Sequence, residues 1–171
     1  FNSAYHMESF LKAAHLLLKE VKDYRCTWAI KEIENKASVL PLGLNLERFN
    51  PFKVEKVKGL ITWNHRWEYD KNPDALFEFM QMIKDKNLPY RFNIIGEQFK
   101  KYPIVFDKIK ECFPEMINRF GYQESFQEYA NALWEAEFCM STADHDFFGI
   151  SVVEAVHCQC TPILPNKLAY P

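Results

Sequence analysis

The chain has 171 residues, 48% of them apolar and 16% aromatic, so it can bury the core of at least one domain. Its formal net charge is −2 at pH 7, so bulk electrostatics predicts no nucleic-acid partner, although a local basic patch stays open. No apolar run approaches the roughly 18–20 residues of a membrane span, and the pattern of a basic-then-apolar leader is missing. We therefore expect no membrane span.

The cysteine pattern favours reduced thiols. The five cysteines are an odd number without paired spacing, and Cys158-x-Cys160 has no second pair with which to complete a zinc site. We therefore expect no structural zinc and no disulfide framework. This usage is typical of a cytoplasmic protein.

Both ends of the chain predict an internal segment of a longer protein. Phe1 opens directly into a helical pattern, and Pro171 follows shortly after a strand-like run. We expect residues 1–50 to be the end of a preceding domain with a linker. Residues 51–171 are expected to be a second domain that is truncated at its C-terminus.

The first part of the chain predicts two helices and a linker. Apolar residues recur at three- and four-residue spacing over residues 7–22, which is typical of an amphipathic helix. A weaker pattern predicts a helix over 27–36, followed by an extended run over 38–43. Proline and polar residues over 45–51 indicate a linker.

The remaining sequence alternates strand-like and helix-like segments. Strands are expected over 59–64, 90–95, 118–120, 137–141 and 161–164, and helices over 73–86, within 102–113, and over 126–136 and 150–157. Short connections between strands and helices predict an α/β fold, a Rossmann-like parallel sheet with helices on both faces.

Polar and aromatic residues follow the strands of this expected sheet. Arg66, Glu97, Tyr122 and the loop at Asp146 each come after a strand. Because the carboxyl ends of parallel strands meet at one edge of the sheet, these residues are expected to converge on a single cleft.

Two cations follow the first of these strands. Arg66 and Lys71 flank a short acidic and aromatic segment, and together they could neutralise a diphosphate. The alternative is a solvated loop in which they pair with Glu68 and Asp70. The residues alone leave both readings open.

Glu154 is a lone carboxylate in an apolar helix-like segment. A buried carboxylate needs partners, because burial without them costs several kcal/mol. Ribose hydroxyls could fill this role, since a carboxylate can accept from two adjacent hydroxyls. A neighbouring backbone amide or Lys167 is the alternative.

The segment before this helix also carries candidate ligand contacts. Asp144 and Asp146 resemble a metal-binding pair, but the glycine turn and helix that follow could hold a diphosphate through backbone amides without metal. His145 could contact the ligand or only shape the loop. Tyr122 could stack on a base or pack into the core.

Three motifs in this order resemble the retaining GT-B glycosyltransferases of family 4. Residues 146–154 read DFFGISVVE, which matches the family's acidic-x7-Glu signature with Asp146 in place of the usual Glu. Arg66 and Lys71 match its Arg-x4-Lys element, and Gly121-Tyr122 matches its glycine turn near the base.

More specific segments resemble the tRNA-queuosine α-mannosyltransferase family. They cover essentially the whole chain and read FNS (1–3), ESFL (8–11), WNHRWEYDKNP (63–73), STADHDFFG (141–149) and LPNKLAYP (164–171). The resemblance implies a GT-B C-terminal donor-binding domain over 51–171, preceded by the end of an acceptor-side N-terminal domain.

The implied reaction is transfer of mannose from GDP-mannose to queuosine in a tRNA anticodon, with retention at the anomeric carbon. No metal or other cofactor is implied, because fixed cations and amides would stabilise the leaving GDP. A family 4 enzyme with another nucleotide sugar and a lipid or polysaccharide acceptor stays open. So does a non-catalytic nucleotide-sugar-binding module.

The resemblance also implies roles for individual residues. Arg66 and Lys71 would hold the diphosphate, and Asp146 would contact sugar hydroxyls as the third catalytic residue. Glu154 would hold the ribose. The other implied donor contacts are Tyr122, His145, Phe148, Gly149, Ile150 and Ser151, the last four of which lie at the turn and the helix start that face the junction of phosphate and sugar.

Overall fold

A computed structural model describes residues 1–20 and 26–171, which form two compact units. The first unit consists of Phe1–Leu44, Asp146–Gly149 and Asn166–Pro171. The second consists of Asn45–His145 and Ile150–Pro165. We describe each unit by itself.

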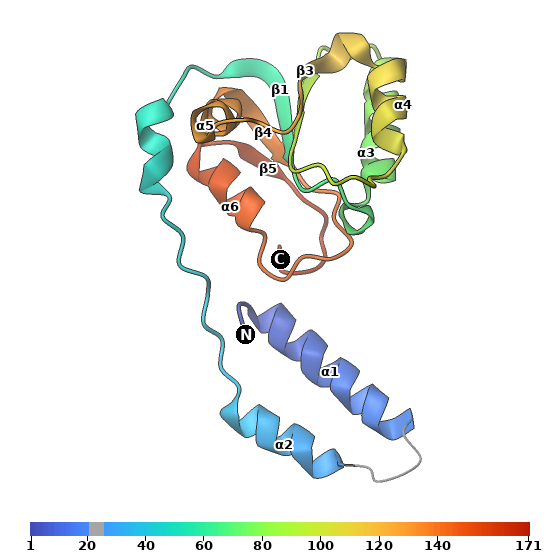
Figure 1. Cartoon of the computed structure of the whole chain (residues 1–171), viewed down its shortest axis with the longest axis vertical. Coiled ribbons are helices and arrows are strands. Elements are labelled where there is room, and N and C mark those ends of the chain that lie inside the picture. The colour runs from blue at the N-terminus through green and yellow to red at the C-terminus, as the bar shows by residue number, and fades with distance from the viewer. Residues whose placement is uncertain (21–25) are drawn as a thin grey trace. The chain divides into compact units, whose positions relative to one another are not determined.

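The second unit is built on a five-stranded parallel sheet (Figure 1). The strand order is β3-β2-β1-β4-β5. After β1 the chain therefore builds one half of the sheet outward and then returns to build the other half, with the reversal between β1 and β4. The expected α/β fold is confirmed. The strands are β1 (Val57–Asn64), β2 (Arg91–Ile95), β3 (Ile117–Gly121), β4 (Ala136–Met140) and β5 (Thr161–Ile163).

Helices cover both faces of this sheet (Figure 1). Two helices, α3 (Pro73–Asp85) and α4 (Val105–Cys112), lie together on one face, where their apolar sides join the hydrophobic core. The other face carries α5 (Phe126–Glu135) and α6 (Ile150–His157). Sequence patterns place the five strands and α3, α5 and α6 to within two residues, and α4 lies within the predicted range 102–113.

Local sequence signals explain where these helices begin. Asn72 adopts a left-handed conformation (φ 48°) and its side chain accepts a hydrogen bond from the Ala75 amide, with Pro73 at the first position of α3. Ser125 and Glu128 form a reciprocal capping box at the start of α5. This cap fixes α5 directly after the chain leaves β3.

The structure corrects the prediction of a linker over residues 45–51. The segment Glu47–Phe52 forms a 3-10 helix, η1, and its Phe49 is completely buried. The indole Nε1 of Trp134 donates to the Phe49 carbonyl at 2.8 Å. The proline and polar residues indicated a linker, but Phe49 and Phe52 both pack against Phe126 and anchor the segment to α5. The other short 3-10 helices are η2 (Tyr69–Lys71) and η3 (Pro114–Met116).

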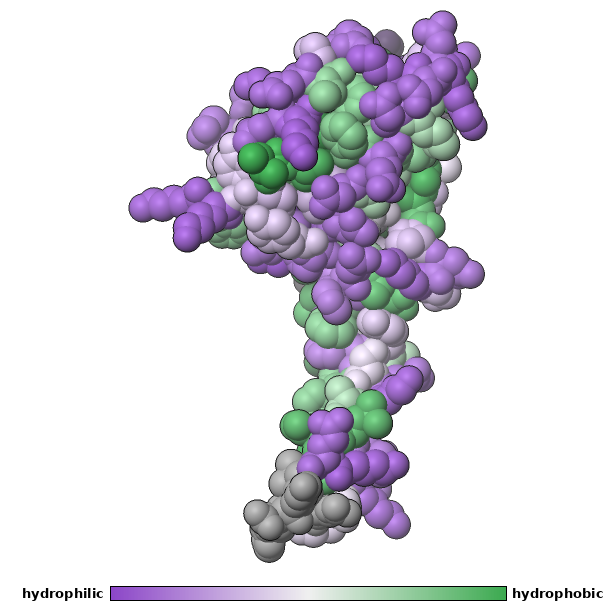
Figure 2. Space-filling view, turned by 90° about the vertical axis from the view of Figure 1, so that its right-hand side faces the viewer, coloured by the Kyte–Doolittle hydropathy of each residue, from purple (hydrophilic) through white to green (hydrophobic). Residues whose placement is uncertain are grey.

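The first unit contains two helices with little core of their own. No residue of α1 (Ala4–Glu20) is buried, and α2 (Thr27–Lys36) buries Ile30 alone. The expected first helix starts three residues earlier than predicted, and its predicted end at residues 21–22 lies outside the described residues. Figure 2 shows apolar side chains on the helical surface, and the large exposed ones are Phe10, Leu16, Leu17, Trp28 and Ile33.

The five cysteines are free thiols, as their spacing predicted. Three of them are buried, and burial raises the pKa of Cys139 and Cys158 to about 12 and that of Cys160 to about 11. These thiols are therefore protonated at neutral pH. Among the helices within residues 1–20 and 26–171, none is long and apolar enough to cross a membrane.

Candidate functional site

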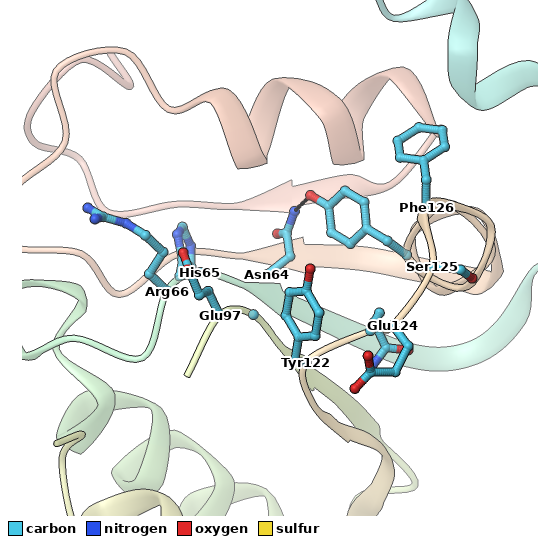
Figure 3. A pocket seen from close by; sticks show the side chains of 11 residues that line it. Asn64, His65, Arg66, Glu97, Tyr122, Glu124, Ser125 and Phe126 are labelled. Atoms are coloured by element: carbon cyan, nitrogen blue, oxygen red, sulfur yellow. Dashed lines mark hydrogen bonds between the residues drawn. The ribbon is translucent and has the colours of Figure 1, made fainter. Parts of the chain in front are cut away.

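A cavity of about 380 Å³ opens at the carboxyl ends of β1, β2 and β3, beside the start of α5 (Figure 3). In a doubly wound sheet this edge is where ligands bind, and β1 borders the point at which the strand order reverses. Of the residues predicted to converge on one cleft, Arg66, Glu97 and Tyr122 line this cavity and Asp146 does not. Its walls are formed by Asn64, His65, Arg66, Gly96, Glu97, Tyr122, Gln123, Glu124, Ser125, Phe126 and Tyr129.

Gly96 lets the ends of β1 and β2 meet at this edge. A Cβ at this position would lie 1.8 Å from the carbonyl oxygen of His65, and the φ angle is 157°. A side chain is excluded there, because the contact is with backbone. The Trp67 amide also donates to the Glu97 carbonyl at 2.9 Å. These contacts hold the loop that carries Arg66 against the end of β2.

Tyr122 follows Gly121, which has a φ of 96°. Its side chain points into the cavity in Figure 3 and is 58% exposed. The alternative of a tyrosine packed into the core is therefore wrong. An exposed ring in a cavity wall offers a face on which a planar ligand can stack.

Arg66 lines the cavity and its guanidinium forms an ion pair with Glu68 at 3.0 Å. The side chain is 54% exposed, and exposed ion pairs are worth at most about 1 kcal/mol. The pairing proposed as the alternative is thus present. It is weak enough for a phosphate to replace the carboxylate.

Lys71 lies in a more enclosed position. Its side chain is 11% exposed, and Nζ pairs with Asp70 at 3.1 Å and donates to the His145 carbonyl at 2.8 Å. The Asp70 carbonyl in turn accepts from the amides of Asp144 and His145 at 2.8 and 3.3 Å. The loop after β1 and the loop after β4 are therefore fixed to each other through Lys71 and its neighbour.

A further chain of bonds joins the same two loops. The Trp63 indole donates to the Thr142 hydroxyl at 2.9 Å, and this hydroxyl donates to the Lys71 carbonyl at 2.7 Å. Trp63 is completely buried in β1. The buried core of the sheet therefore fixes the backbone of Lys71 at the sheet edge.

Glu154 is 8% exposed, and each of its carboxylate oxygens has a partner. Arg48 Nη2 donates to Oε1 at 2.8 Å, and the Tyr129 hydroxyl donates to Oε2 at 2.7 Å. The alternatives foreseen from the sequence were a backbone amide and Lys167, and these two side chains were missed. They lie 106 and 25 residues away along the chain.

Asn64 connects the cavity to this carboxylate. Its Nδ2 donates to the Tyr129 hydroxyl at 3.2 Å, drawn as a dashed line in Figure 3, and to the Ser151 carbonyl at 2.9 Å. The Ser151 hydroxyl lies 3.2 Å from His65 Nδ1. Burial and the charge of Glu154 raise the pKa of Tyr129, which keeps its hydroxyl protonated and able to donate.

In the first unit, Asp146 organises the glycine turn. Its Oδ1 accepts from the Gly149 amide at 2.8 Å and from the Phe148 amide at 3.3 Å, and Oδ2 accepts from the Tyr170 hydroxyl at 3.2 Å. Gly149 has a φ of 81°, which glycine adopts at low cost. The two amides that the resemblance assigns to the ligand are thus engaged by the aspartate.

The predicted site residues fall into three groups. The cavity is lined by Arg66 and Tyr122. The hydrogen-bond networks beside it, within the second unit, hold Lys71, His145, Ser151 and Glu154. The first unit contains Asp146, Phe148 and Gly149. Ile150 begins α6 and is 41% exposed. The described residues contain no group of three or more His, Cys, Asp or Glu side chains arranged to hold a metal. A metal-free reaction stays a prediction.

Several cavity residues were not singled out from the sequence, chiefly Asn64, Glu124, Ser125 and Tyr129. The capping signal of Ser125 and Glu128 directly after the Gly121-Tyr122 turn could have placed the start of α5 in the cleft. Asn64 ends a buried strand, which is an unusual place for an amide side chain. Arg48 carries no comparable signal.

The chain is similar to known proteins of one family. Residues 1–44 match the family model described as tRNA-queuosine alpha-mannosyltransferase N-terminal. The tRNA-queuosine alpha-mannosyltransferase of Drosophila melanogaster is 36% identical over 182 aligned residues, which cover 100% of this chain and 48% of the relative. The resemblance read from the sequence is confirmed. The chain spans about half the length of this relative.

Solved structures share the fold at low identity. The pneumococcal O-GlcNAc transferase in complex with UDP and GlcNAc matches with a TM-score of 0.62 at 13% identity, over 98% of this chain and 30% of the other. The sucrose-phosphate synthase of Thermosynechococcus elongatus gives 0.58 at 16%, over 81% and 38%. The C-terminal domain of a group 1 glycosyl transferase from Francisella tularensis gives 0.56 at 16%, over 77% and 69%.

Proposed function

We infer that this chain belongs to the tRNA-queuosine alpha-mannosyltransferase family and carries the donor-binding half of a retaining glycosyltransferase. The longer protein would transfer mannose from GDP-mannose to queuosine in a tRNA anticodon. One observation supports this most: the cavity at the carboxyl edge of the parallel sheet is lined by Arg66 and Tyr122, in a chain 36% identical along its whole length to a protein of that name.

The cavity supports a nucleoside diphosphate as the ligand. Tyr122 would stack on the base, and Arg66 would exchange its weak ion pair with Glu68 for the diphosphate. Lys71 uses two contacts to hold its place and would donate a further N–H to phosphate. Glu154 would accept from the ribose hydroxyls through lone pairs beyond those that Arg48 and Tyr129 occupy.

Asp146 would contact the sugar. A ligand that takes the amides of Phe148 and Gly149 must first displace the Asp146 carboxylate from them. Release of the amides and reorientation of Asp146 are thus one event. This coupling would let the same side chain turn toward the sugar hydroxyls when the phosphate binds.

The chemistry would rest on electrostatic preorganisation. Cleavage of the bond between the anomeric carbon and the phosphate leaves negative charge on GDP, and fixed cations near that oxygen lower the barrier. Lys71 suits this role, because the loop network fixes its ammonium before the reaction begins. We propose that no metal is required.

The location and the acceptor are also part of this proposal. Free, buried thiols suit a reducing compartment such as the cytoplasm. The net charge of −2 requires that any tRNA-binding surface be locally basic, or lie in the part of the protein outside this chain. We propose that residues 1–44 end an acceptor-side domain, since α1 and α2 expose large apolar side chains.

A binding module without catalysis is the second candidate. The chain covers 48% of its relative, so the 171 residues alone could hold a nucleotide sugar without completing an active site. A family 4 enzyme with another donor and a lipid or polysaccharide acceptor is a further alternative, because the solved structures share only the fold.

Titration of the chain with GDP, GDP-mannose, UDP and UDP-glucose tests the donor assignment. We expect GDP and GDP-mannose to bind and the uridine nucleotides to bind more weakly. Arg66→Ala and Glu154→Ala should each weaken binding, and both should abolish transfer in the longer protein. A preference for UDP would remove the mannose assignment but keep a glycosyltransferase, and no binding at all would contradict both candidates.

A further inference from the structure

The carboxylate of Glu154 is held from two sides by residues of distant segments. Arg48 comes from η1, before the first strand of the sheet, and Tyr129 comes from the middle of α5. Each makes one short hydrogen bond, to a different carboxylate oxygen. Two contacts on different oxygens fix the rotation of the carboxylate as well as its position.

Arg48 is itself well anchored. Its guanidinium carbon lies 4.6 Å from the centre of the Phe126 ring and 5.2 Å from that of the fully buried Phe49. Contacts with aromatic faces favour a cation at this distance. The side chain is 50% exposed while that of Glu154 is 10% exposed, so the arginine supplies charge to a carboxylate that water hardly reaches.

The hydroxyl of Tyr129 has a defined direction. Asn64 Nδ2 can only donate, so the hydroxyl accepts from Asn64 and gives its proton to Glu154. Asn64 and Tyr129 line the cavity, whereas Glu154 does not. The carboxylate is therefore connected to the cavity through these two side chains.

The side-chain amide of Asn64 has a defined orientation. Its Oδ1 is buried and has no hydrogen-bond partner among the described residues, and the amide cannot turn over because Nδ2 must serve the Ser151 carbonyl. The two donated bonds, to Tyr129 and to the Ser151 carbonyl, therefore fix the orientation of this amide.

We propose that Arg48 and Tyr129 are positioning residues of the donor site, which hold the carboxylate of Glu154 oriented to accept from the ribose hydroxyls of a nucleoside diphosphate. This inference rests on the proposed function, since it takes Glu154 as the ribose-binding residue. It adds that η1, which looks like a linker in sequence, contributes to the affinity for the donor.

The test compares binding of GDP with binding of 2′,3′-dideoxy-GDP, which lacks the ribose hydroxyls. Arg48→Lys, Arg48→Gln and Tyr129→Phe are measured by calorimetry beside the unchanged chain. Each variant should weaken GDP binding on the order of tenfold, the effect of one charge-assisted hydrogen bond. The affinity for dideoxy-GDP should be the same in all four proteins.

Arg119→Lys is the matched control. Arg119 also forms an ion pair with a glutamate, Glu135 at 2.6 Å, but it lies outside the cavity lining. It should change neither affinity. Thermal melting shows whether each variant is folded. If either Arg48 variant unfolds, Tyr129→Phe still tests the inference, because it removes only one oxygen atom.

Equal GDP affinity in the variants and the unchanged chain would overturn the inference and leave the proposed function intact. An equal loss for GDP and dideoxy-GDP would also overturn it, because the residues would then act on the fold and not on the ribose. If the unchanged chain binds no nucleoside diphosphate, the proposed function fails and the inference fails with it.

Discussion

The ammonium of Lys71 lies 2.8 Å from the carbonyl oxygen of His145, and this contact joins the loop after β1 to the loop after β4. The two strands are neighbours in the sheet, on either side of the point where the strand order reverses. A cation is thus fixed at the edge where the fold binds ligands. It acts both as a structural tie and as the proposed phosphate contact.

Replacement of Lys71 separates these two roles. Lys71→Met keeps most of the apolar stem but removes both contacts, and it should lower the free energy of unfolding by about 1–3 kcal/mol. GDP binding should weaken further, because the proposed phosphate contact is lost as well. Urea unfolding and calorimetry measure the two effects. Lys108→Met, on the exposed side of α4, should change neither quantity.

Gly96→Ala tests the close approach of β1 and β2. The added Cβ would meet the His65 carbonyl oxygen at 1.8 Å, so the loop that carries Arg66 must move. We expect a loss of stability of about 1–3 kcal/mol, together with weaker GDP binding, measured by urea unfolding and calorimetry. Gly43→Ala is the control, because a Cβ there has no atom within 4 Å. A stability loss as large for Gly43→Ala would contradict the steric explanation.

Phe49→Ala tests whether η1 belongs to the folded domain. Phe49 is completely buried, and truncation of such a side chain costs about 3–5 kcal/mol. Phe52→Ala, in the same short helix but only partly buried, should cost clearly less. Urea unfolding compares the two. Similar small effects would mean that the segment is a linker after all.

The buried thiols predict how stability depends on pH. Burial raises the pKa of Cys139 and Cys158 to about 12, so the folded chain keeps protons that the unfolded chain releases above the ordinary pKa of about 8.5. Their contribution is complete below that pH and is lost as the pH rises toward 12. Urea unfolding at pH 7 and at about pH 10 should show a fall in stability that is smaller in Cys139→Ala. An equal fall in the free energy of unfolding of that variant would show that the Cys139 thiol is not the cause.

The fold was predictable because its signals are local. The alternation of apolar strands with amphipathic helices predicted the parallel sheet, and Pro73 marked where one helix begins. The cleft followed from the same strands, since residues after parallel strands share one edge. Arg66 and Tyr122 therefore fell in the cavity as expected.

The contacts that hold the site were not predictable in the same way. Arg48 and Glu154 are 106 residues apart, and nothing in either segment indicates the other. Phe49 lies in a short, polar, proline-containing stretch, so no periodicity reveals its burial. The engagement of the Phe148 and Gly149 amides by Asp146 depends on the rotamer of one side chain. Such pairings are settled by three-dimensional packing.

The most direct test of the central claim is transfer of labelled mannose by the longer protein that contains this chain. Labelled GDP-mannose is supplied with queuosine-containing tRNA, and in parallel with the same tRNA lacking queuosine. We expect label in the first tRNA and none in the second, and we expect Arg66→Ala to abolish the transfer. Equal labelling of both tRNAs, or of neither, would contradict the account.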